Sequence, residues 1–141
     1  MTPNNRNVSG IDIGLLILRG AGLFLLLTFG WEKFWLYARL IGTRTPLASA
    51  GLTPLIRAMG FPAPALLGIY AALNESVGSL LIACGLWTRL ACIFAAMNMA
   101  GAFYVSIRLE EEPLRAAVYL VIFATLAITG PGRFSVDHVR R

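Results

Sequence analysis

The chain has 141 residues, of which 57% are hydrophobic and only 13% charged, and its mean hydropathy is +0.72. Soluble domains are about half apolar and about a quarter charged, so this chain has too little polar surface for a soluble domain of its size. The composition predicts one integral membrane domain over residues 1–141. The net charge of +5 does not indicate a nucleic-acid partner, because the arginines mostly border apolar runs, as they do in membrane proteins.

The first predicted span covers residues 11–30, about the length that crosses the hydrocarbon core of a bilayer. It is as long as a full span and no small-residue cleavage site follows it, so we expect it to be retained rather than removed as a signal. One helical face collects small and basic residues: Arg19, Gly22, Gly30 and Lys33. Small residues on such a face let a neighbouring helix approach closely. Aromatic residues suited to a membrane–water interface follow: Trp31, Trp35 and Tyr37.

The long connection over residues 40–64 is rich in proline and glycine, which excludes a further span there. Within it, residues 53–59 begin with Thr53 followed by Pro54. Threonine is a good helix cap and proline suits the first helical position. We therefore expect a short interfacial helix between spans one and two.

Three more spans are predicted, over residues 65–86, 90–107 and 114–129. The second and third each present a face of small residues around one polar side chain, Glu75 and Asn98 respectively. The fold class is thus an all-α membrane protein, a bundle of four transmembrane helices with both termini on one side. Arg89 and Arg133 directly flank helix ends on that side, which favours cytoplasmic termini in a bacterial-type inner membrane.

Glu75 is the residue that most needs explaining, because a carboxylate in the middle of a span is costly and by default faces a partner or a cavity. Counting along ideal helices places Arg19 and Glu75 at similar depths, so an ion pair between them is one expectation. In that case the pair locks two spans together. In the other interpretation Glu75 is a catalytic, protonatable carboxylate beside a quinone or thiol substrate, with Arg19 as a binding residue.

Other side chains carry weaker predictions. Asn98 serves as interhelical glue or as a ligand contact, and Trp31 with Lys33 anchors the interface or binds a quinone head group. Cys84 and Cys92 flank the turn between spans two and three, where they act either as small buried residues or as a redox pair. The sequence has no cluster of histidines, cysteines or carboxylates with the spacing of a metal site, so none is predicted.

Several motifs recur in an order that resembles a known family: Arg19, Gly30-Trp-Glu-Lys33, Met59-Gly-Phe-Pro-Ala-Pro-Ala65, Glu75 with Gly78, Gly85-Leu-Trp-Thr-Arg89 and Gly130-Pro-Gly-Arg-Phe-Ser135. From about Leu15 to Asp137 the chain is similar to proteins of the DoxX family. The resemblance implies a four-helix membrane bundle tied to redox functions. Such relatives include small subunits of a terminal quinol oxidase and of a thiosulfate:quinone oxidoreductase, and partners of a superoxide dismutase and a sulfurtransferase.

Together these observations predict a small membrane subunit of a respiratory or photosynthetic electron-transfer complex, with an accessory role near a quinone or pigment. One alternative is a stand-alone quinone-linked oxidoreductase in which Glu75 handles protons, and another is an assembly factor for membrane proteins. We expect no covalently held cofactor, a quinone that is bound or shared with a partner, and further membrane subunits or copies of the chain as partners.

Overall fold

In the computed structural model, residues 10–44, 46 and 51–139 are described, and all regular structure among them is helical. The first long helix runs through α1 (Gly10–Leu25), the π-helical turn η1 (Leu26–Gly30) and α2 (Trp31–Gly42). The short α3 (Thr53–Ala58) follows, and then a second long helix made of α4 (Pro64–Leu73), the π-helical turn η3 (Asn74–Gly78) and α5 (Ser79–Cys84). The remaining helices are α6 (Thr88–Arg108), α7 (Leu114–Thr129) and the short α8 (Val136–Val139).

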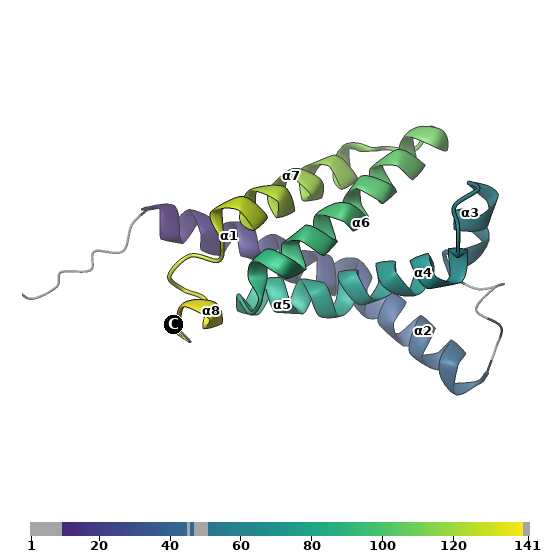
Figure 1. The fold of residues 1–141 in the computed structure, drawn as a ribbon, viewed down its shortest axis with the longest axis horizontal. Coiled ribbons are helices and arrows are strands. Elements are labelled where there is room, and N and C mark those ends of the chain that lie inside the picture. Colours follow the sequence, from purple (N-terminus) through teal and green to yellow (C-terminus); the bar gives the residue numbers. More distant parts are fainter. Residues whose placement is uncertain (1–9, 45, 47–50, 140–141) are drawn as a thin grey trace, which may run out of the picture.

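The helices form the bundle expected of an all-α membrane protein (Figure 1). Within the described residues, three helices are long and apolar enough to cross a membrane: Gly10–Gly42, Pro64–Cys84 and Thr88–Arg108. The fourth, α7, has 16 residues, about 24 Å of helix, and packs against α6 as an antiparallel hairpin. The start of α1 and the C-terminal α8 lie at one end of the bundle, and α3 lies at the other (Figure 1).

The long helices do not keep the predicted bounds of the first three spans. The first was expected to end near Gly30 but continues to Gly42, because residues 31–42 contain no proline or other helix breaker. The second ends at Cys84, two residues early, since Gly85 takes a left-handed conformation (φ 72°). The third begins at Thr88, where the Asp137 carboxylate accepts hydrogen bonds from the Trp87 and Thr88 amides at 2.8 and 2.9 Å.

The apolar core lies between α1, α5, α6 and α7. Its fully buried members include Ile82, Cys92, Phe123 and Leu126. Large apolar side chains also cover the outside of the bundle, among them Val121 and Ile128 on α7. An outer surface of this kind is unfavourable in water and favourable in contact with lipid tails, so the burial pattern agrees with the composition.

The two long helices make their closest approach where their π-helical turns meet. Gly30, the last residue of η1, is buried against the backbone of η3. A Cβ atom at position 30 would overlap the carbonyl oxygen of Glu75 and lie 2.6 Å from the carbonyl carbon. Only glycine therefore allows this approach, which brings α2 alongside Glu75.

The short helix α3 forms where the sequence predicted it, but its threonine does not cap it. Leu52 precedes the first turn, and the Thr53 side chain is buried, with a hydroxyl that has no hydrogen-bond partner among the described residues. The Tyr37 hydroxyl instead accepts a hydrogen bond from the Leu52 amide at 3.4 Å. Tyr37 of α2 thus ties the start of α3 to the first long helix.

The contact at Gly30 predicts a difference between two glycine-to-alanine variants. In Gly30→Ala the new methyl group must push η1 and η3 apart, and overpacking of this kind typically costs about 1–3 kcal/mol. In Gly20→Ala the methyl meets no neighbouring atom, and alanine in a helix is about 1 kcal/mol better than glycine. Unfolding in mixed detergent–SDS micelles should show Gly30→Ala destabilised and Gly20→Ala unchanged or more stable. Equal stabilities would contradict the close packing.

Candidate functional site

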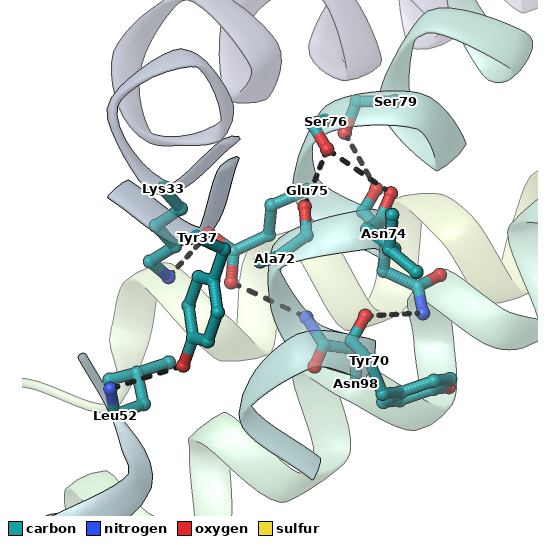
Figure 2. A network of polar contacts seen from close by, with 11 residues as sticks. Lys33, Tyr37, Leu52, Tyr70, Ala72, Asn74, Glu75, Ser76, Ser79 and Asn98 are labelled. Carbon is teal, nitrogen blue, oxygen red and sulfur yellow. Dashed lines mark hydrogen bonds and ion pairs between the residues drawn. The ribbon is translucent and has the colours of Figure 1, made fainter. Parts of the chain in front are cut away.

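Glu75 lies in the π-helical turn η3, near the middle of the second long helix, and only 6% of the residue is exposed. Such turns occur often at functional sites, because the extra residue changes the direction in which side chains point. Two serines bond to backbone carbonyls beside the turn: Ser76 Oγ donates to Ala72 O at 2.6 Å, and Ser79 Oγ donates to Asn74 O at 3.3 Å (Figure 2). These bonds satisfy carbonyl groups that water cannot reach.

Both oxygens of the Glu75 carboxylate have partners from other helices. Lys33 Nζ, from α2, donates to Oε2 at 2.5 Å and forms an ion pair with it. Asn98 Nδ2, from α6, donates to Oε1 at 3.4 Å (Figure 2). The carboxylate is therefore neutralised by an ammonium group and linked to a neutral amide. This arrangement keeps an acid tolerable inside an apolar bundle.

The predicted ion pair between Arg19 and Glu75 is wrong. Arg19 is buried toward the end of the bundle where α8 lies, and its guanidinium donates to four carbonyls: Ile82 at 3.1 Å, Ala83 at 2.7 Å, Pro131 at 3.4 Å and Phe134 at 2.7 Å. These bonds join the end of α5 to the C-terminal segment. The prediction counted depth along straight helices. It could not include the carbonyls that become available where α5 ends and the C-terminal segment folds back.

Two other expectations involve residues away from Glu75. Trp31 is 58% exposed and packs edge-to-face with Trp35 rather than contributing to the site. Cys84 is exposed and Cys92 is fully buried, and both are free thiols. Of the residues predicted to bind a cofactor, the structure thus brings Lys33 and Asn98 to Glu75.

A cavity of about 420 Å³ reaches the ion pair from the side of α3. Its walls are mostly apolar and come from α3, the loop that follows it, α4 and α6, including Leu55, Ile56 and Phe61. Five polar residues are also part of its lining: Lys33, Glu75, Asn98, Tyr70 and Ser106. An apolar cavity of this size with a few placed polar groups is typical of a small-molecule site.

Sequence reasoning missed part of this cavity. Tyr70 lines it, and the Tyr70 hydroxyl donates to Phe94 O at 2.8 Å, which ties α4 to α6. Gly101 also lines it, and a Cβ there would meet no atom within 4 Å, so its small size leaves space rather than allowing a helix contact. A small-residue face in the sequence indicates close packing as readily as it indicates a cavity.

The DoxX family model matches residues 14–107, which include the Lys33, Glu75 and Asn98 site. The chain belongs to the DoxX family. It is 32% identical over 134 residues to "Inner membrane protein YqjF" of Escherichia coli strain K12, an alignment that covers 91% of this chain and 92% of that protein. No solved structure gave a significant match. The family, this relative and the apolar helices together identify the chain as an integral membrane protein.

The ion pair predicts non-additive stabilities. Removing one partner of a buried pair leaves an uncompensated charge and typically costs about 3–5 kcal/mol, so Lys33→Met and Glu75→Gln should each be strongly destabilising. The double variant leaves neither charge, so its loss of stability should be smaller than the sum of the two single losses by at least ~1 kcal/mol. Arg39→Met, on an exposed position of the same helix, is the control. Additive single effects in SDS unfolding would show that the pair is not formed.

Arg19 should behave independently of Glu75. Arg19→Lys keeps the charge but lacks the planar fork with which the guanidinium reaches four carbonyls, so it should be destabilising. Because Arg19 and Glu75 share no partner, the effects of Arg19→Lys and Glu75→Gln should add within about 0.5 kcal/mol. A larger coupling energy in the same unfolding assay would support the ion pair between Arg19 and Glu75 that the sequence predicted.

Proposed function

We propose that this DoxX protein binds a quinone in the cavity beside Glu75 and exchanges protons with it, within a membrane electron-transfer assembly. The observation that carries the proposal is the mostly apolar cavity that reaches a buried, paired carboxylate. A bound quinone supplies a redox couple that takes up two electrons and two protons. The electrons come from, or go to, a redox protein partner in the same membrane.

The residues present fit such a molecule. The apolar walls from α3, α4 and α6 suit a ring and a hydrocarbon tail, while Asn98, Lys33 and Tyr70 offer hydrogen-bonding groups. Met97 lines the same cavity and is 61% exposed on the outer surface of α6. The cavity thus extends toward the surface that faces lipid, which gives a membrane-soluble ligand a way in.

Each polar residue has a defined task in this proposal. Glu75 holds or releases a proton at its carboxylate oxygens. The Lys33 ammonium stabilises the charged carboxylate and loses that role when Glu75 is protonated. Asn98 orients Oε1 through its amide. Burial keeps bulk water away from the ligand, so a proton reaches the ligand through Glu75 rather than directly from the solvent.

The setting follows from the relative and from the sequence. We place the protein in an inner membrane, as the name of YqjF states for that protein, with both termini in the cytoplasm. In a second version of the proposal the chain is an accessory subunit that only shapes a partner's quinone site. The many large apolar side chains outside the bundle, such as Phe24 and Val121, leave room for such a partner in the membrane.

A pair of matched variants tests the cavity. Gly101→Leu should fill it without meeting the backbone, whereas Gly20→Leu adds the same side chain to an exposed position of α1. With a decyl-tailed benzoquinone and purified protein in mild detergent, Gly101→Leu should weaken binding at least ~10-fold because the ligand loses its space. Gly20→Leu should bind as the unmodified chain does.

The outcomes separate the versions. Absence of quinone binding to the unmodified chain, purified alone, would refute a complete site in this chain, and recovery of binding with a co-purified partner would support the accessory role. Equal binding by both leucine variants would show that the quinone binds elsewhere.

A further inference from the structure

A second cavity lies against the Lys33–Glu75 pair, of about 190 Å³, between the first long helix, α6, α7 and the loop that joins α6 to α7. Four residues line both this cavity and the larger one: Lys33, Glu75, Ala102 and Ser106. The ion pair therefore stands at a wall between two cavities rather than at the end of one.

The two cavities differ in their chemistry. The larger is walled mostly by apolar side chains, whereas the smaller, hereafter the polar cavity, is lined largely by ionisable and hydroxyl-bearing residues. They are Lys33, Glu75, Ser106, Glu111, Glu112, Arg115 and Tyr119. At ~30 Å³ for each water, the polar cavity has room for about six waters, and its polar side chains provide the hydrogen-bond partners that such waters need.

The polar cavity also has a direction. Glu111 and Glu112 belong to the exposed α6–α7 loop, and Glu75 is buried at mid-bundle. Along α6, Ser106 lies nearest the loop, with Ala102 and Met99 one and two turns deeper on the same face. The lining thus runs from the aqueous surface to the buried carboxylate.

Charged and polar groups from the neighbouring elements set the electrostatics of this path. Lys33 faces Glu75 from α2 and Asn98 faces it from α6, while Tyr70 of α4 lines the larger cavity. On α7, Arg115 lies over the Phe29 ring at 5.0 Å and Tyr119 is stacked on Phe123. These ring contacts hold both side chains against the cavity wall. At the mouth of the cavity, Glu111 and Glu112 together carry more negative charge than Arg115 carries positive charge. The resulting negative potential favours hydrated cations and protons.

We infer that the polar cavity is a hydrated path through which protons pass between the water at the α6–α7 loop and the carboxylate of Glu75. The use of those protons by a ligand rests on the proposed function, whereas the path itself does not. Glu75 accepts a proton from this water, and the proton then returns to the water or, in the proposed function, passes to the ligand, which restores the neutral pair with Lys33. A hydrophobic ligand and a proton then reach the same carboxylate from different sides.

Thiol accessibility tests the path directly. In a Cys84→Ser background, which removes the exposed native thiol, single cysteines are placed at Ser106 and Ala116 in the cavity lining. The control is Val121→Cys, on the outer surface of α7. The probe is a cationic, membrane-impermeant methanethiosulfonate added to proteoliposomes. Cysteines at positions 106 and 116 should react at least ~10-fold faster than the one at 121, and only from the side of the α6–α7 loop.

A plug variant tests whether Ser106 controls the path. Met99→Cys places a thiol deep in the polar cavity, and adding Ser106→Leu should lower its labelling rate at least ~10-fold, because leucine fills the space nearer the loop. Adding Gly101→Leu, which fills the other cavity, should leave that rate unchanged. Folding of each variant is checked by monodisperse elution in detergent.

The results distinguish the path from the quinone site. Labelling no faster than the Val121→Cys control at both 106 and 116 would overturn the path while leaving quinone binding intact. Fast labelling at both positions, blocked by Ser106→Leu, supports the path even if no quinone binds. In that case the proposed function fails and the hydrated path remains.

Discussion

The ion pair between Glu75 and Lys33 is the contact on which the arrangement of this bundle depends. A carboxylate at mid-span is tolerable only if a cation reaches it, and the available cation lies on a helix that must come within a few ångströms. That approach requires glycine at position 30, because the backbone of Glu75 occupies the space that a Cβ atom would need there. It also requires the first helix to continue beyond Gly30, since Lys33 would otherwise lie in a loop.

The two π-helical turns fit this requirement. Each inserts one extra residue into a helix and so rotates the side chains that follow it. They occur at the point of contact, with η1 ending at Gly30 and η3 containing Glu75. Beyond that contact the walls of both cavities include α6. Close packing at one level of the bundle therefore coexists with open space next to the ion pair, where a ligand or water can enter.

Composition and small-residue faces were enough to predict a helical membrane bundle, a short helix after the first span, and the buried face that holds Glu75. They were not enough to predict the partner of Glu75. Gly30 followed by Trp31 looks like the end of a span, so Lys33 was expected at the membrane interface, as an anchor or a quinone-binding residue. The cavities were equally inaccessible to sequence reasoning. A glycine such as Gly101 that lines open space has the same sequence signal as a glycine such as Gly30 that permits contact.

The first long helix carries two buried or half-buried cations that differ in what they can do. Arg19 carries a planar fork of N–H donors that suits four fixed carbonyls, so it holds the end of α5 and the C-terminal segment together. Lys33 has a compact ammonium on a flexible chain and contacts only Oε2 of the Glu75 carboxylate. An arginine in its place could bind both carboxylate oxygens at once with its planar fork. The lysine leaves Oε1 to the weaker contact with Asn98, so part of the carboxylate stays available to the ligand and the water path that we propose on its two sides.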